Sequence, residues 1–265
     1  MPGCRGARRA SGGAFLPDDL DMVKRSAGVR RSALDGFGIQ LNERYADLVK
    51  SYARIVEQRN ALLKDPATSS ALIFAWNDSL AQTGTALLQH RLALLARLRA
   101  ELVRVYGEVA AGEVAAVSYS GPLGDEAELA GVSRDELTER YLDKLEEVAD
   151  LERTRGVTLV GPHRDDIHLS VDGRDARTFA SQGQQRSLVL AWKAAEVEVT
   201  RDILGSTPLL LLDDVMSELD EHRRHAFMDF VGGEVQTVIT TTNLGYFAPE
   251  MLDAAKVVEI HGQKA

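Results

Sequence analysis

Hydrophobic residues recur at helical spacing over two long stretches in the first half of the chain. The first stretch covers residues 39–64 and ends at Asp65-Pro66, and the second begins near Ser69 and stops at Gly112. In each, apolar positions three or four residues apart give one apolar face. Because only the short segment DPATS separates them, the pattern predicts two antiparallel helices forming an arm. A plain helical bundle fits the same spacing.

In the second half of the chain, short apolar runs replace the helical spacing. Ser133 and Glu136 predict a capped helix that ends near Leu151, and Asp172-Gly173 predicts a hairpin turn. The later alternation of strand and helix indicates parallel crossover units. Strands are predicted at 113–119, 157–160, 167–171, 208–212, 236–241 and 256–260. We therefore expect a helical arm domain over 39–155 and an α/β lobe over 156–265.

The N-terminal residues divide into two segments. Residues 1–14, MPGCRGARRASGGA, lack apolar periodicity, so we expect disorder rather than a core strand. Residues 15–38 open a helix at Pro17 and contain a basic cluster, a candidate contact for the phosphate backbone of DNA. The alternative is a solvated helix face whose charges balance nearby aspartates. The cluster consists of Lys24, Arg25, Arg30 and Arg31.

Composition narrows the class of protein without deciding its function. A hydrophobic content of 45% with 27% charged residues fits a soluble globular protein, and the apolar runs are shorter than a membrane span. A single cysteine, Cys4, excludes an internal disulfide, and no signal-peptide pattern is present, so a cytoplasmic location is expected. The net charge of −9 argues against a protein coated in nucleic acid but permits a local basic patch.

Two carboxylates follow the most apolar of the predicted strands. In PLLLLDDVMSELD, residues 208–220, Asp213 and Asp214 stand at the end of the strand and Asp220 lies in the next loop. Nucleotide hydrolases use such positions to bind Mg²⁺ and to polarise the attacking water. The alternative is that both residues cap a following helix, although adjacent carboxylates at a buried strand end repel each other without a cation or donors.

The segment ASQGQQR, residues 180–186, places small and amide residues at the start of a predicted helix. Such a start lets an anion approach the unpaired backbone N–H groups, although an ordinary cap explains the same residues. The order of this helix start, the strand ending in Asp213-Asp214, the SELD loop and a strand ending in polar residues is similar to the distal lobe of ABC-type ATPase heads. Their signature is usually written LSGGQ.

Longer sequence motifs restrict the resemblance to one family of these ATPases. GPHRDD at 161–166, SQGQQRSLVLAWKAAE and LLLLDDVMSELDEHRR resemble the RecF family of bacterial recombination mediators, in the ABC and SMC-like group. FLPDDLDMVKRSAGVRRSALD and YARIVEQRNALLK resemble the segments that precede and begin the short helical arm of that family. Together these strings cover residues 15–260.

The resemblance implies ATP-dependent dimerisation on DNA, slow ATP hydrolysis with Mg²⁺, and cooperation with RecR and RecO to load RecA at single-strand gaps. It implies that the signature residues meet the γ-phosphate of a nucleotide held by the opposite subunit, Ser181 through its hydroxyl and Gly183 through its N–H. Gln182 departs from the commonest glycine of the signature. The residues matched to the motifs are Ser181, Gln182, Gly183 and Gln184 in the signature, Asp213 for Mg²⁺, Asp214 as catalytic acid, Ser217, Glu218 and Asp220 in the dimer-crossing loop, and Thr241 where many ABC heads carry a switch histidine.

The Gly-rich phosphate loop of that family has no counterpart here, because no Gly-Lys pair occurs in the 265 residues. We therefore expect a partial RecF without its first lobe, which binds ATP weakly or not at all by itself and exposes an apolar edge of the 208–213 strand. A non-catalytic DNA- or partner-binding remnant is the alternative function. A metal-dependent phosphatase using Asp213 and Asp214 leaves GPHRDD unexplained. Within that motif, a structural role is favoured for His163 and Arg164.

Overall fold

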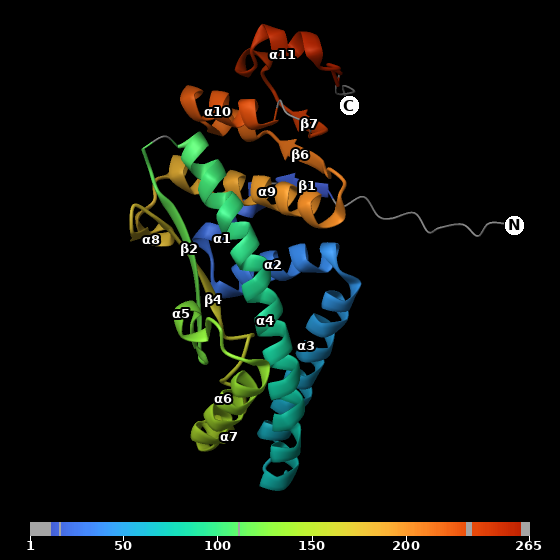
Figure 1. Ribbon diagram of the computed structural model, residues 1–265, viewed down its shortest axis with the longest axis vertical. Coiled ribbons are helices and arrows are strands. Elements are labelled where there is room, and N and C mark those ends of the chain that lie inside the picture. Colours follow the sequence, from blue (N-terminus) through green and yellow to red (C-terminus); the bar gives the residue numbers. More distant parts are fainter. Residues whose placement is uncertain (1–11, 16, 111, 232–234, 261–265) are drawn as a thin grey trace, which may run out of the picture.

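The computed structural model describes residues 12–15, 17–110, 112–231 and 235–260. Helices α3 and α4 form an arm at one end of the molecule, and an α/β lobe forms the other (Figure 1). The helices are α1 (Asp21–Lys24), α2 (Ala27–Leu41), α3 (Glu43–Lys64), α4 (Ser70–Val109), α5 (Glu126–Leu129), α6 (Arg134–Glu147), α7 (Ala149–Arg155), α8 (Ala176–Phe179), α9 (Gln182–Leu204), α10 (Glu221–Val231) and α11 (Pro249–Ala254), with 3-10 turns η1 (Pro17–Leu20), η2 (Val215–Glu218) and η3 (Leu244–Tyr246).

The two long helices of the arm confirm the prediction from apolar spacing. Local capping sets their ends: Asn42 accepts a hydrogen bond from Arg44 N at 2.9 Å at the start of α3, and Ser69 Oγ accepts one from Leu72 N at 3.3 Å at the start of α4. Helix α4 is 40 residues long and continues from the arm past α9 in the lobe (Figure 1). One element therefore belongs to both parts of the molecule.

The strands form two sheets. Strands β1 (Gly12–Phe15), β6 (Leu209–Asp213) and β7 (Thr237–Thr240) make a parallel sheet in the order β1-β6-β7. Strands β2 (Ala115–Gly121), β3 (Gly124–Asp125), β4 (Asp166–Val171) and β5 (Arg174–Asp175) make an antiparallel sheet in the order β3-β2-β4-β5. Asp172 (φ 50°) and Gly173 (φ 73°) form the predicted hairpin turn between β4 and β5. The α/β fold class is confirmed.

Two strand predictions and part of one prediction of disorder are wrong. Residues 157–160 form no strand, because Thr158 N binds Asn60 Oδ1 and Leu159 N binds Glu152 Oε1 instead of a neighbouring strand. Residues 256–260 are also outside any strand. By contrast, Gly12–Ala14, which were expected to be disordered, belong to β1 and pair in parallel with β6. The rest of that N-terminal prediction, residues 1–11, lies outside the described residues.

Strand β6 is the central strand of its sheet, so the expectation that one of its edges is exposed is wrong. Its neighbours β1 and β7 occupy both edges. Part of one face of the sheet is exposed to solvent. On this face Leu211 is 39% exposed, and its register partner Val238 is 49% exposed. Leu210 and Leu212 point to the opposite face and are buried.

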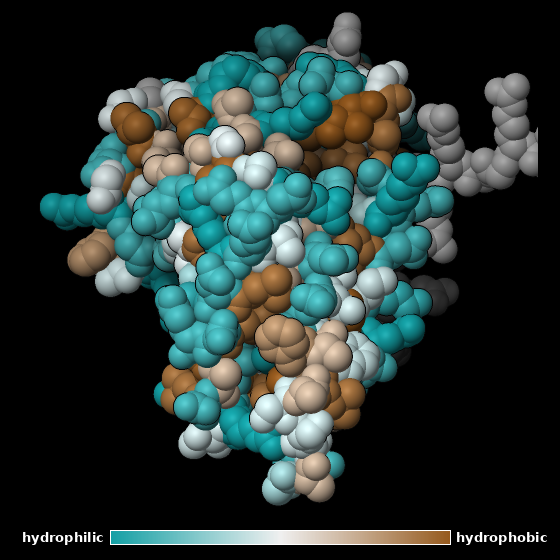
Figure 2. Space-filling view, turned by 60° about the horizontal axis from the view of Figure 1, so that its bottom comes forward, coloured by the Kyte–Doolittle hydropathy of each residue, from teal (hydrophilic) through white to brown (hydrophobic). Residues whose placement is uncertain are grey.

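The described residues form two hydrophobic clusters, and α4 contributes to both. The larger one joins α4 and α9 with α1, α2, α10 and strands β2, β4 and β6, and the smaller one joins α3, α4 and α6 through Tyr52, Leu80 and Tyr141. On the surface seen in Figure 2, hydrophobic residues form separate small groups among hydrophilic ones. Among the described residues, no helix is both long and apolar enough to cross a membrane.

Candidate functional site

The signature segment forms the N-terminus of α9. Ser181 Oγ accepts a hydrogen bond from Gln184 N at 3.2 Å, and Gln184 Oε1 accepts one from Ser181 N at 2.8 Å. This reciprocal pair is the capping box that the spacing S-x-x-Q favours. Ser181 and Gln182 are exposed. The start of the helix is therefore fixed by side chains and open to solvent.

Arg223 of α10 brings the signature next to the SELD loop. A β-carbon on Gly183 would collide with Nη1 of Arg223, so the absent side chain lets the guanidinium lie against the backbone of α9. Arg223 N donates to Asp220 Oδ1 at 2.9 Å, and Nη1 lies 3.5 Å from Asp220 Oδ2. No sequence motif singles out Arg223. Its only signal was its position three residues after Asp220 in the string SELDEHRR.

The two carboxylates of the apolar strand lie where β6 ends. Thr240 Oγ1, at the end of β7, donates to Asp213 Oδ1 at 2.5 Å and accepts from Asp214 N at 3.1 Å. Asp214 has left-handed backbone geometry, with φ 48° and ψ 30°, so the chain turns out of the extended strand at this residue. The side chain of Asp213 is exposed, whereas Asp214 is half-buried. Neither residue caps a following helix through its side chain: Asp214 precedes η2 without a side-chain cap bond, and Asp220 accepts from Arg223 N at the start of α10.

The chemistry of these carboxylates fits a magnesium ion. Asp214 Oδ1 is buried and has no hydrogen-bond partner among the described residues, and a buried oxygen without a partner is costly unless a cation, a donor or water completes it. Hard carboxylate oxygens are the ligands that Mg²⁺ prefers, usually one or two with water. Within the described part of the chain, no group of three or more His, Cys, Asp and Glu residues is placed to hold a metal. A magnesium site here would therefore draw on few protein ligands.

The remaining predicted positions lie in the segments after β6 and β7. Ser217 Oγ donates to Asp214 O at 2.9 Å, which ties turn η2 to the end of the strand. Glu218 ends η2, and its side chain lies outside the described residues. Thr241 Oγ1 lies 3.2 Å from both the N and the O of Asn243, so this hydroxyl closes a local turn.

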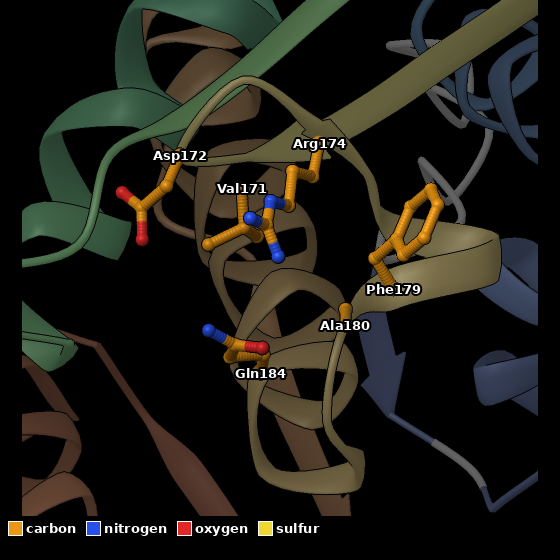
Figure 3. Close-up of a pocket in the computed structure, with 6 residues that line it drawn as sticks. All are labelled: Val171, Asp172, Arg174, Phe179, Ala180 and Gln184. Carbon is orange, nitrogen blue, oxygen red and sulfur yellow. The ribbon is translucent and has the colours of Figure 1, made fainter.

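A cavity of about 450 Å³ opens beside the signature helix. It lies between the β4–β5 hairpin, α8 and the first turn of α9, and Figure 3 shows Gln184 and the guanidinium of Arg174 on its walls. Its lining residues are Val171, Asp172, Arg174, Phe179, Ala180 and Gln184. The amide of the signature residue Gln184 therefore faces a space that reaches the surface.

The basic cluster of the N-terminal segment does not form one surface. Arg30 is 6% exposed and binds Asp166 through two bonds, Nε to Oδ1 at 2.8 Å and Nη2 to Oδ2 at 2.9 Å. Arg31 donates to the carbonyl oxygen of Asp165. Arg30 is thus buried and bound to Asp166, whereas Arg31 is only half-buried, and a DNA contact by either residue stays a prediction. Lys24 and Arg25 are exposed and stay predictions.

GPHRDD forms a polar network in which Asp165 is buried, His163 is half-buried and Arg164 is exposed. His163 binds Tyr52 OH through Nδ1 at 2.8 Å and the carbonyl of Thr158 through Nε2 at 3.0 Å, and Arg164 donates to the same carbonyl. Burial, together with nearby arginines, lowers the pKa of His163 from 6.5 to about 4. Asp165 accepts from Tyr119 OH, and burial raises its pKa to about 6. These contacts agree with the structural role favoured for His163 and Arg164.

The parallel sheet, the signature helix and the carboxylates at the end of β6 define a lobe of an ABC-type ATPase head that carries a helical arm. The chain belongs to the family of the DNA replication and repair protein RecF. It is 37% identical to that protein of Acaryochloris marina over 254 residues, 93% of this chain and 67% of the relative. It is 40% identical to RecF of Gloeobacter violaceus over 252 residues, 93% of this chain and 66% of the relative.

Solved structures agree with this assignment. The structure of the recombination mediator protein RecF-ATP in the RecFOR pathway matches with a TM-score of 0.78 at 27% identity, over 88% of this chain and 62% of that chain. A second structure of the same protein, RecF-ATPrS, matches with a TM-score of 0.79 at 27% identity, over 89% and 63%. No family model matches the chain. The chain thus spans about two thirds of the length of its relatives.

Proposed function

We propose that this chain supplies the signature side of an ATP-dependent DNA repair complex. A nucleotide held by the phosphate loop of a facing subunit meets Ser181 and Gly183, and the resulting dimer on DNA works with RecR and RecO to load RecA at single-strand gaps. The observation that carries the proposal is the placement of Gly183 and Asp220 against one arginine, Arg223, in a chain of the RecF family. Signature and SELD loop then form one surface for a facing subunit.

The start of α9 has the donors that a phosphate requires. Ser181 Oγ accepts the hydrogen bond of Gln184 N, and this leaves the hydroxyl hydrogen itself for a phosphate oxygen. The first N–H groups of a helix have no partner within that helix, so those of Gln182 and Gly183 add to the site. Gln182 retains this backbone donor although its side chain departs from the usual glycine.

The end of β6 has the acceptors for the hydrolytic step. Asp213 would hold Mg²⁺, whose charge offsets that of the phosphate oxygens. Asp214 Oδ1, which lacks a partner among the described residues, would accept a hydrogen bond from the attacking water. Thr241 offers a neutral hydroxyl where related heads use histidine, so this position adds no group that titrates near pH 7.

We expect the chain alone to bind ATP weakly, because its 265 residues contain no Gly-Lys phosphate-loop pair. The test titrates the chain into a fluorescent ATP analogue and follows anisotropy, first alone and then with a full-length RecF subunit whose own signature serine is replaced. Binding by the mixture only, lost with Ser181→Ala, supports the proposal. Micromolar binding by the chain alone contradicts it. DNA binding that neither ATP nor Ser181→Ala changes would favour the remnant function.

A further inference from the structure

Arg223 links three segments that are distant in sequence. Its Nη2 pairs with Glu113 Oε1 at 2.8 Å, its Nη1 lies 3.5 Å from Asp220 Oδ2, and its guanidinium lies against Gly183. The side chain is only 15% exposed. The arginine is therefore held in one place, between the signature, the SELD loop and the segment that follows the arm helix α4.

The position of this arginine is electrostatically unusual. The N-terminus of a helix carries partial positive charge, so a cation there is unfavourable by itself. The carboxylates of Glu113 and Asp220 offset that charge in the structure described here. An anion that reaches Ser181 and Gly183 meets the helix N-terminus and the guanidinium together, and it competes with Glu113 for the same donors.

Glu113 also connects this arginine to the arm. Its second oxygen, Oε2, accepts a hydrogen bond from Tyr106 OH at 2.6 Å. Tyr106 lies in the last turn of α4, the helix that runs the length of the arm, and is fully buried. Burial, and then the contact with Glu113, raises the pKa of Tyr106, so its hydroxyl stays a donor. One carboxylate thus joins the arm helix to the cation beside the signature.

We propose that Arg223 is an additional phosphate ligand of the signature site, paired with Glu113 until the phosphate of the facing subunit's nucleotide arrives. Arg223 then exchanges Glu113 for a phosphate oxygen, and Glu113 retains only Tyr106 on α4. The exchange makes nucleotide-dependent association sensitive to the arm. This inference rests on the proposed function, because it requires a nucleotide to meet Ser181 from a facing subunit.

The experiment measures association of this chain with the full-length subunit described above, by sedimentation in the presence and absence of the poorly hydrolysed analogue ATPγS. Arg223→Gln should weaken the ATPγS-dependent association roughly tenfold or more, since it removes a charge-assisted bond. Glu113→Gln should strengthen it several-fold, because the competing carboxylate is gone while the amide oxygen still accepts from Tyr106. Arg223→Lys should fall between Arg223→Gln and the parent chain.

The opposite effects of Arg223→Gln and Glu113→Gln on association distinguish an exchange of Glu113 for phosphate from a purely structural ion pair. If Glu113→Gln weakens association as Arg223→Gln does, or if Arg223→Gln has no effect, the inference is wrong. Arg104→Gln is the matched control, because it removes an arginine that pairs with two carboxylates, Glu101 and Glu108, on the exposed side of α4. Each variant's fold is checked by circular dichroism. Association that is unaffected by Ser181→Ala contradicts the proposed function itself, independently of Arg223.

Discussion

Arg59 on α3 and Glu152 on α7 form an ion pair whose side chains are 1% and 0% exposed, with Nη2 and Oε2 2.6 Å apart. Glu152→Gln removes the only charge facing a desolvated guanidinium in this pair. We expect a loss of about 3–5 kcal/mol in the free energy of unfolding, measured with urea. Glu136→Gln, which breaks the exposed pair with Arg140, should cost less than about 1 kcal/mol. Equal losses of unfolding free energy in the two variants would contradict the assignment of Arg59–Glu152 as a buried, stabilising ion pair.

His163 should make stability depend on pH. Because burial lowers its pKa to about 4 from 6.5 in the unfolded chain, the folded protein binds fewer protons than the unfolded chain between these values. This contribution to stability is complete above pH 6.5 and is lost as the pH falls toward 4. We expect His163→Gln to reduce the drop in melting temperature between pH 7 and pH 5. An unchanged drop would show that the imidazole does not titrate in this window.

Asp165 works in the opposite direction. Its pKa is raised to about 6 from 3.8, mainly by burial, so the folded protein binds more protons than the unfolded chain between these values. Its contribution is present at low pH and is lost as the pH rises through 6. Asp165→Asn should therefore steepen the acid-induced loss of melting temperature that His163 causes. The same thermal scans at pH 7 and pH 5 check this expectation, and a shallower loss would reverse the assigned sign.

The chemistry of a single residue could be predicted from the sequence only where a local motif carries it. The capping box of Ser181 and Gln184 spans three residues and could be predicted. Arg30 could not be, because its partner Asp166 is 136 residues away in sequence and only the fold brings the two together. Arg223 was missed for the same reason, since Gly183 and Glu113 are distant in the chain. Long-range pairs of this kind leave no spacing to detect.

At the scale of elements, two glycines of α4 should respond oppositely to the same substitution. A β-carbon at Gly84 would lie 2.5 Å from Tyr141 Cε1 and 3.0 Å from Tyr52 Cε2, both buried, whereas one at Gly107 would meet nothing within 4 Å. Gly107→Ala should stabilise the protein by roughly 0.5–1 kcal/mol through helix propensity. Gly84→Ala should destabilise it by about 1–3 kcal/mol, because α3 and α6 must move. Urea unfolding of both variants tests this, and stabilisation by Gly84→Ala would contradict close packing there.

Elements could be predicted from the sequence where the interactions that form them are local in the chain. Helices α3 and α4 could be predicted because apolar spacing and caps lie within each helix. Strand β1 could not be, since its Gly-rich residues form a strand only by pairing with β6, nearly 200 residues later. The apolar run at 157–160 shows the opposite error, a predicted strand that does not form. The side chains of Asn60 and Glu152 accept hydrogen bonds from its N–H groups. A short apolar run does not reveal which partner its backbone will find.

At the scale of the whole molecule, we expect α4 to make arm and lobe one cooperative unit. Leu80 and Leu87 of this helix lie in the arm cluster, whereas Leu95, Leu98 and Leu102 lie in the lobe cluster. Each of the five side chains is at most 1% exposed. Neither cluster can lose its packing without unfolding a helix that the other cluster needs.

The two tryptophans of the chain can test this coupling, because Trp76 lies in the arm on α4 and Trp192 lies in the lobe on α9. Trp192 is 1% exposed and donates to Glu196 Oε1 at 2.7 Å, whereas Trp76 is half-buried. In Trp76→Phe and in Trp192→Phe, the remaining fluorescence should change at the same urea concentration as the far-ultraviolet circular dichroism of that variant. Trp192→Phe should shift both probes together to lower urea, because it removes the donor to Oε1 of the buried Glu196 carboxylate and leaves only Lys193 on Oε2. Fluorescence of Trp76 that changed at a separate, lower midpoint would show that the arm unfolds independently.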